Sequence, residues 1–256
     1  MSLVAAMGTL ASAHGALVGH WEFDNSGDVG QATVSSSLET VGDAAYSASG
    51  KFGGALTLDG TSDYLRVDGS HTLASGMPTG DASYTVAAFI QTTTNAKRGI
   101  VGWGNYGSGG QVNAFRTTTA GEFGSTGGIL NYSWGGGVDY GEAAGGTAPG
   151  TIYDGQWHHV AVTYDSASST KRLYFDGAEI GSGKVLSGDL NVGAANFRIG
   201  STNSGEFFNG LLDDVRVYDA ALSQSEINDL ATAVPEPSTT ALLGLGGLAL
   251  ILRRRK

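Results

Sequence analysis

Cysteine is absent from this chain of 256 residues. Its absence excludes disulfide bonds, zinc sites built on thiolates and catalysis by a thiol nucleophile. An exported protein without disulfides is ordinary in bacteria and less usual among secreted animal domains. Stability must come from packing, and a hydrophobic content of 41% is sufficient for a core.

Basic residues are scarce: 14 Lys and Arg stand against 24 Asp and Glu, for a net charge of -10. The last four residues, Arg253 to Lys256, are all basic, so the rest of the chain carries a charge of -14. Such a surface repels nucleic acid and anionic lipid, and we expect no nucleic-acid partner. It suits calcium or neutral and cationic partners, although solubility alone also explains it.

Catalytic motifs are missing as well. There is no Glu-x-Asp-x-Glu triplet, the spacing that places paired carboxylates on one face of a strand. Glu122, Glu142, Glu179 and Glu206 are each isolated in the sequence. Neither a Gly-x-Ser-x-Gly elbow nor a phosphate-binding loop occurs. We therefore predict no catalytic residue and no enzymatic activity; a site assembled from distant strands is the alternative.

Short alternating segments separated by Gly, Asp, Asn and Ser fill the middle of the chain, residues 16–232. This pattern predicts an all-β fold, an antiparallel β-sandwich. Asp176-Gly177 predicts a hairpin turn, and Ser223 with Glu226 predicts the capped start of one short helix. Trp157 is expected to pack into the core. The clearest strand segments are 17–23, 55–58, 84–90, 158–164, 172–175, 178–180 and 211–218.

The first 15 residues resemble the end of a secretory signal, with a short apolar run before the small residues Ala11-Ser12-Ala13. The charged segment that opens a complete signal is missing, so we interpret residues 1–15 as a truncated signal peptide. A frayed or strand-like N-terminus is the alternative.

The C-terminal residues 233–256 form a separate tail. Pro235-Glu236-Pro237 precedes an apolar stretch, 239–252, and then the basic cluster 253–256. As a helix the apolar stretch is roughly 21 Å long, short of a bilayer core of about 30 Å. Basic residues at its end favour the cytoplasmic side. We expect an apolar tail helix outside the sandwich.

This three-part tail resembles the PEP-CTERM sorting signal of Gram-negative bacteria. The resemblance implies an exosortase-type protease as a partner, which would cut at the Pro-Glu-Pro site. It also implies an exported protein at the cell envelope, the outer surface or outside the cell, transiently anchored in the inner membrane through the tail. An ordinary tail anchor is the alternative.

Seven phrases of the middle region resemble the laminin-G-like, or concanavalin A-like, superfamily in their order. The resemblance implies a jelly-roll sandwich and a carbohydrate-binding or adhesion module without catalysis. The superfamily also hosts hydrolases and lyases, and a structural envelope protein that binds other proteins is a third possibility. The phrases cover residues 19–24, 50–60, 63–65, 83–90, 154–165, 173–177 and 207–218.

The same resemblance implies a structural calcium ion. In bacterial β-glucanases of the superfamily, a related strand carries an aspartate that binds calcium, and the match falls on Asp213. Backbone carbonyl oxygens near Asp24 and near Asp59-Gly60 would complete the shell of six to eight oxygen atoms that calcium prefers.

A ligand site is expected between residues 99 and 150, where aromatic residues lie among glycines. Aromatic rings stack on the apolar faces of sugars while polar groups bind the hydroxyls, so a glycan or exopolysaccharide is the expected partner. Tyr132 and Trp134 alternate with Ser133 and should share one face. About half of the aromatic residues should instead fill the core. The predicted ligand residues are Trp103, Tyr106, Tyr132, Trp134 and Tyr140.

Overall fold

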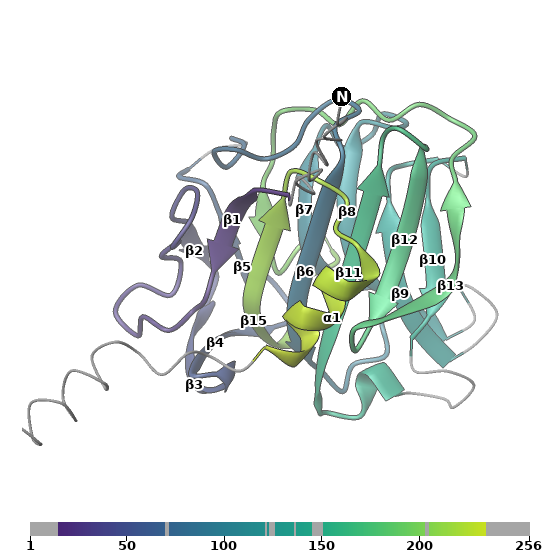
Figure 1. Cartoon of the computed structure of the whole chain (residues 1–256). Helices are drawn as coiled ribbons and strands as arrows, with labels where there is room; N and C mark the ends of the chain where they lie inside the picture. The colour runs from purple at the N-terminus through teal and green to yellow at the C-terminus, as the bar shows by residue number, and fades with distance from the viewer. Residues whose placement is uncertain are drawn as a thin grey trace, which may run out of the picture.

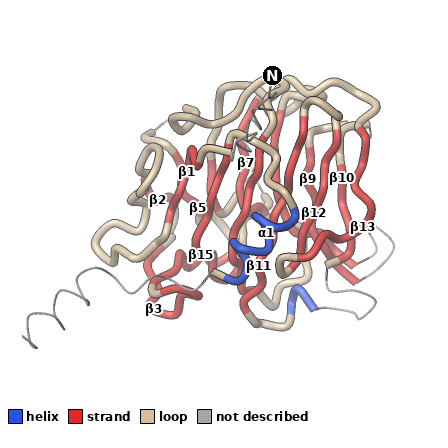
Figure 2. The backbone as a smooth tube through the Cα atoms, in the orientation of Figure 1, coloured by secondary structure: helices blue, strands red, loops and turns tan. Residues whose placement is uncertain are grey.

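Two antiparallel sheets lie face to face in the computed structural model, which describes residues 15–69, 72–120, 122, 126–135, 137–144, 151–202 and 205–233 (Figure 1). Sheet A has the strand order β13-β12-β11-β6-β15-β4-β3, and β1 pairs with β15. Sheet B has the order β10-β9-β8-β7-β14-β5-β2. Strands dominate the chain, as Figure 2 shows, so the predicted all-β sandwich is confirmed.

The bounds of the elements are as follows. Sheet A contains β1 (Leu17–Trp21), β3 (Ala45–Phe52), β4 (Gly54–Asp59), β6 (Tyr84–Gln91), β11 (Trp157–Asp165), β12 (Thr170–Phe175), β13 (Ala178–Val185) and β15 (Asn209–Tyr218). Sheet B contains β2 (Glu39–Val41), β5 (Tyr64–Arg66), β7 (Gly99–Gly104), β8 (Val112–Ala120), β9 (Thr126–Tyr132), β10 (Tyr140–Ala143) and β14 (Arg198–Ile199). The helices are the 3₁₀ turn η1 (Thr151–Tyr153) and α1 (Gln224–Thr232).

Alternation along the strands divides core from surface. On β6, Tyr84, Val86, Ala88 and Ile90 belong to the core between the sheets, and Ala87 instead belongs to a smaller apolar cluster with α1. That second cluster places α1 on the outer face of sheet A, where the helix lies across the sheet in Figure 1. Successive strand residues point to opposite faces, which is why one strand serves both clusters.

A buried polar bridge joins the two sheets inside the core. The Tyr84 hydroxyl of β6 donates to Asn131 Oδ1 of β9 at 2.9 Å. Asn131 Nδ2 in turn donates to Asn113 Oδ1 of β8 at 2.6 Å. All three side chains are essentially inaccessible to solvent. Buried polar groups are costly unless they are paired, so these bonds favour one register of β9 against sheet A.

Local predictions are largely confirmed. Ser223 caps α1 and forms a capping box with Glu226. Asp176 and Gly177 form the turn between β12 and β13, both with positive φ. The placement of Trp157 in the core was wrong. Core-facing residues of β11 follow the parity of Val160, so Trp157 lies on the other side and is only partly buried.

The two predicted address segments lie almost entirely outside the described residues. Of residues 1–15 only Gly15 is described, and the tail is described only at Ala233. The expected tail helix therefore stays a prediction. Among the residues that the structure does describe, no helix is long and apolar enough to cross a membrane.

Candidate functional site

The outward-facing residues of sheet B form a row that crosses five strands. Residues paired across neighbouring strands share a face. The two small residues at the centre of the row, Ala114 and Gly102, are buried. The Tyr106 hydroxyl reaches over Gly102, where a Cβ would lie 2.6 Å from it. Strand by strand, the row contains Tyr132, Ala114, Gly102, Arg198 and Arg66. We call this surface the outer face of sheet B.

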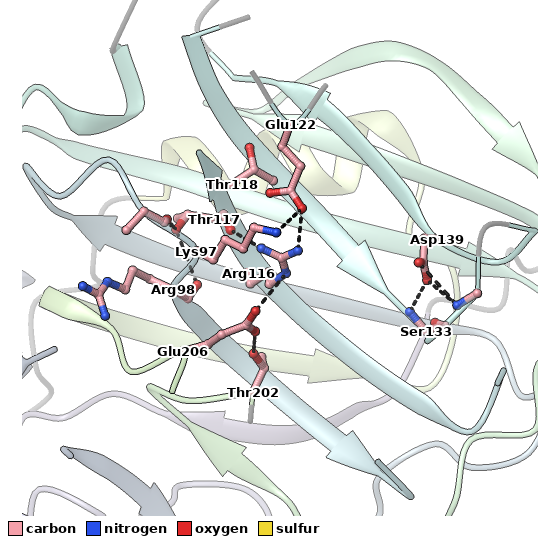
Figure 3. Close-up of polar contacts among 12 residues, drawn as sticks. Lys97, Arg98, Arg116, Thr117, Thr118, Glu122, Ser133, Asp139, Thr202 and Glu206 are labelled. Carbon is pink, nitrogen blue, oxygen red and sulfur yellow. Dashed lines mark hydrogen bonds and ion pairs between the residues drawn. The ribbon is translucent and has the colours of Figure 1, made fainter. Parts of the chain in front are cut away.

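A charged network lies on the same face, two residues along β8 from Ala114. Arg116 Nη2 donates to Glu122 Oε1 at 2.9 Å, and Lys97 Nζ lies 2.9 Å from the same oxygen. Glu206 Oε1 lies 3.8 Å from Arg116 Nε on the other side of the guanidinium (Figure 3). The Arg116 side chain is only 5% exposed. Arg116 thus contacts the carboxylates of both Glu122 and Glu206, which are far apart in the sequence.

The cations determine the protonation of Glu122. Burial raises the pKa of this carboxyl, but hydrogen bonds from Lys97 and Arg116 outweigh burial and lower it below its usual value. Within the described residues, Glu122 Oε2 is buried and has no hydrogen-bond partner. The network therefore contains an ionised carboxylate, which can accept hydrogen bonds but cannot donate one.

Four of the five predicted aromatic residues form two groups, one in the core and one at the surface. Trp103 is fully buried in the core, and Tyr140 also belongs to the core, where its hydroxyl accepts a hydrogen bond from Gly183 N at 3.0 Å. Neither offers a ring to a ligand, contrary to the prediction. At these positions β7 and β10 turn their side chains toward the core. Tyr132 and Trp134 remain at the surface as a tilted pair with ring centroids 5.5 Å apart.

Tyr106 lies between these groups. Its hydroxyl is buried and has no hydrogen-bond partner among the described residues. Tyr106 therefore packs against the sheet over Gly102, and its hydroxyl is not available to a ligand. The Tyr132 ring also faces the charged network, because Arg116 Cζ lies 5.8 Å from its centroid. The aromatic pair and the network are thus continuous.

Trp134 has an unusual backbone. Its φ is 68°, in the left-handed region that bulky residues rarely adopt. The residue is 38% exposed. The Asp139 carboxylate accepts hydrogen bonds from the backbone N–H of Ser133 at 2.6 Å and of Gly135 at 3.3 Å, one on each side of the tryptophan (Figure 3). The loop between β9 and β10 is therefore built to present this ring.

A buried lysine lies beneath the same loop. Lys171 of β12 is 0% exposed, and its Nζ donates to Ser133 Oγ and to Val138 O, both at 2.8 Å. Burial lowers the pKa of Lys171 to about 7, against the opposing effect of Asp139; Lys184 adds a smaller lowering.

On sheet A, Asp213 and Asp24 converge on one turn. Asp213 Oδ2 accepts a hydrogen bond from Phe52 N at 2.9 Å, and Asp24 Oδ1 accepts one from Gly54 N at 2.6 Å. Phe23 has a φ of 57°, and its carbonyl oxygen lies 2.4 Å from where a Cβ on Gly54 would be. Two carboxylates and a backbone carbonyl therefore gather around residues 52–54.

The neighbouring aspartates of β15 differ sharply. Asp214 Oδ1 is bound by His20 Nε2 at 2.6 Å and Arg216 Nε at 2.9 Å, which lower its pKa although burial opposes them. Asp213 is 0% exposed, and within the described residues its Oδ1 has no hydrogen-bond partner. Burial, together with Asp214 and Asp24, raises the pKa of Asp213 to about 7. A buried carboxyl group that pairs with no cation among the described residues fits a hard metal ion such as calcium.

The other two predicted calcium residues lie elsewhere. Asp59 closes the opposite end of β4, roughly 17 Å from Gly54 at the usual rise per strand residue, and its carboxylate accepts from Thr61 N at 2.7 Å. Gly60 O accepts from Arg98. The prediction for this turn was wrong, since the strand separates it from Asp213. No group of three or more His, Asp or Glu side chains is arranged for a metal ion in the described part of the chain.

Sequence reasoning missed the residues that organise the outer face. Glu122 and Glu206 were treated as isolated, and only folding brings both to Arg116. Lys171 stood in an unremarkable strand segment. One signal was available: Lys171 has the parity of Leu173 and Phe175, so alternation alone places a lysine on the core side.

Comparison with protein families gives two matches. Residues 59–228 match the profile of the Concanavalin A-like lectin/glucanases superfamily, and residues 233–256 match the PEP-CTERM protein-sorting motif. The first covers more than half of the chain. The second coincides with the tail that begins at Ala233.

Among curated proteins, a sushi, von Willebrand factor type A, EGF and pentraxin domain-containing protein of Rattus norvegicus is 33% identical over 95 residues, 34% of this chain. Neuronal pentraxin-1 of Homo sapiens is 32% identical over 105 residues, 38% of this chain. The matched regions are only 3% and 23% of those proteins.

Among solved structures, domain 4 of AbnA, a GH43 extracellular arabinanase from Geobacillus stearothermophilus, in complex with arabinotriose, has a TM-score of 0.64. It is 23% identical, and the match covers 85% of this chain and 99% of that one. The binding domain of Paraclostridial Mosquitocidal Protein 1 has a TM-score of 0.60 at 13% identity, covering 84% of this chain and 51% of that one. Both show a shared fold.

The lowered pKa of Lys171 predicts a specific dependence of stability on pH. An unfolded lysine titrates near 10.4, so between about pH 7 and 10 the unfolded chain binds more protons than the folded one. The free energy of unfolding should therefore rise with pH there, by at most about 1.4 kcal/mol per unit. Urea unfolding at pH 7, 8 and 9 checks this. Lys171→Met should remove the rise and Lys184→Met should keep it; equal slopes in wild type and Lys171→Met would contradict the assignment.

Proposed function

The chain belongs to the concanavalin A-like lectin/glucanases superfamily and carries a PEP-CTERM sorting motif, and from this premise we propose that its sandwich is a non-catalytic carbohydrate-binding module. The outer face of sheet B is the proposed binding face. The observation that carries the proposal is the surface pair of Tyr132 and Trp134 beside the charged network of Arg116.

The chemistry of this face matches that of a sugar. Aromatic rings pack against the apolar face of a pyranose or furanose ring, and nearby polar groups bind its hydroxyls. Tyr132 and Trp134 supply the rings. Arg198, which lies over the Tyr64 ring at 5.2 Å, supplies hydrogen-bond donors on the same face. The fold is shared with a domain solved in complex with arabinotriose, which is compatible with this use.

The arrangement of the carboxylates favours binding over hydrolysis. A glycosidase needs one carboxylic acid that remains protonated, which requires a raised pKa. The pKa of Glu122 is lowered by Lys97 and Arg116. The guanidinium of Arg116 also lies between Glu122 and Glu206 and contacts both carboxylates. These features support a module without catalytic residues.

The sorting motif indicates export and sorting at a membrane through the C-terminus. We propose further that an exosortase-type protease processes the Pro235-Glu236-Pro237 site, and that the module then acts at the cell envelope or outside the cell. A glycan or exopolysaccharide of that environment is the proposed partner.

Calcium is the proposed structural cofactor. Asp213 and Asp24 would hold it, with the carbonyl oxygen of Phe23 as a further ligand from this chain. The ion would neutralise the buried Asp213 carboxylate and fasten β15 to the turn that joins β3 and β4. Its role would be stability, because Asp213 lies on sheet A, Asp24 follows β1 of the same sheet, and the proposed sugar face is on sheet B.

Glycan binding predicts a strong effect of the surface aromatic pair. Against a panel of polysaccharides and a glycan array, Trp134→Ala and Tyr132→Ala should each weaken binding by about tenfold or more, equivalent to about 1.4 kcal/mol. Trp134→Phe should retain part of the affinity because a ring remains. Arg172→Ala, on the outer face of sheet A, should bind as the wild type does.

The same samples separate the alternatives. Release of reducing ends or unsaturated products would establish a hydrolase or lyase and contradict the non-catalytic proposal. Failure to bind any glycan, with calcium and without it, would contradict carbohydrate binding and favour a structural envelope protein.

Calcium binding predicts a shift of the melting temperature. At a hundredfold excess over its dissociation constant, an ion that binds only the folded state stabilises it by about 2.7 kcal/mol. For a domain of this size that corresponds to about 5–10 °C. Melting with calcium and with chelator should show this difference in the wild type and lose it in Asp213→Asn. Asp59→Asn is the matched control and should keep the difference in melting temperature. Identical wild-type curves with calcium and with chelator would contradict calcium binding.

A further inference from the structure

Lys171 is an ionisable residue at a position that packing alone would fill with an apolar side chain. On β12 it follows the inward parity of Leu173 and Phe175, both in the core. Its side chain is 0% exposed. Burying an ammonium group is costly unless it is paired and hydrogen-bonded, so the contacts at its end must offset that cost.

Those contacts are all with the loop that presents Trp134. Lys171 Nζ donates to Ser133 Oγ, one residue before the tryptophan, and to Val138 O, four residues after it, at 2.8 Å each. A side chain from sheet A thereby ties together the two ends of a loop that belongs to sheet B. The tie crosses from one sheet to the other beneath the exposed ring.

Asp139 adds further hydrogen bonds to the loop between β9 and β10. Its carboxylate accepts from Ser133 N and Gly135 N, and its carbonyl oxygen accepts from Lys184 Nζ at 2.7 Å. Lysines from β12 and β13 thus both reach this loop. The backbone of Trp134, at a φ of 68°, is in a strained conformation that persists only where the surroundings impose it.

We propose that Lys171 is a positioning residue for the sugar-binding face: by binding Ser133 Oγ and Val138 O it holds Trp134 in its exposed, left-handed conformation. This inference rests on the proposed function, in which the Trp134 ring stacks on a sugar. Lys171 itself is sealed in the core and does not touch the ligand. It acts by keeping the loop in the state that binds.

The expected effect follows from populations. If the loop relaxes without its tie, only a fraction of molecules has Trp134 in the binding conformation, and the apparent dissociation constant rises by the inverse of that fraction. A fall of the competent fraction to one tenth weakens binding about tenfold. The conformation of Trp134 should change even when no sugar is present.

The test is ¹⁹F NMR of the full chain labelled with 5-fluorotryptophan. The chain has four tryptophans, Trp21, Trp103, Trp134 and Trp157, and the Trp134→Phe variant assigns the resonance of interest. Lys171→Met should shift, broaden or split the Trp134 resonance and leave those of the buried Trp21 and Trp103 in place. Affinity for the polysaccharide bound by the wild type should fall about tenfold. Lys51→Met, on β3, is the matched control and should change neither.

A second variant guards against misfolding. Ser133→Ala removes one of the two acceptors and leaves the lysine in place, and it should perturb the Trp134 resonance in the same direction by a smaller amount. An unchanged Trp134 resonance in folded Lys171→Met, or in Ser133→Ala if the former does not fold, would overturn the proposal. The Trp134 resonance is recorded without sugar. If the wild type binds no glycan, the proposed function is contradicted, but the effect of Lys171→Met on the Trp134 conformation can still be measured.

Discussion

The hydrogen-bonded bridge of Tyr84, Asn131 and Asn113 is the interaction on which the surface of sheet B depends. It is buried between the sheets and holds Asn131 of β9 inward. Because a shift of one residue would exchange the two faces of a strand, this pairing also determines that Tyr132, the last residue of β9, points outward. The row of outward residues continues across β8, β7 and β14 from there. The core therefore specifies what the protein presents to a ligand.

Much of the fold could be predicted because it is local. The alternation of 84–90, the turn at Asp176-Gly177 and the capping box at Ser223 are properties of neighbouring residues, and each is confirmed. Trp157 shows the limit of that reasoning. Its large apolar ring suggested the core, but the parity of β11 is determined by pairing with β6 and places it on the other side.

The site could be predicted only in part, because its groups come from distant segments. Tyr132 points outward as alternation required and Trp134 lies beside it, whereas Trp103 fills the core because β7 turns that side inward. The network of Arg116, Glu122 and Glu206 has no signature in the sequence. Likewise, Asp24 joins Asp213 through the turn between β3 and β4, while Asp59 is carried away by the length of β4. Distance along the sequence predicted neither the approach of Asp24 to Asp213 nor the separation of Asp59 from it.

The claim that sugars bind the outer face of sheet B is tested most directly by mapping the contact in the ¹⁵N-labelled protein. A bound oligosaccharide should shift the amide resonances of Tyr132, Trp134, Ala114, Gly102 and Arg198, which lie along one row of the sheet. Resonances of α1, on the outer face of sheet A, should remain in place. Shifts confined to sheet A, with the sheet B row unaffected by a sugar that binds, would contradict the assignment of the face.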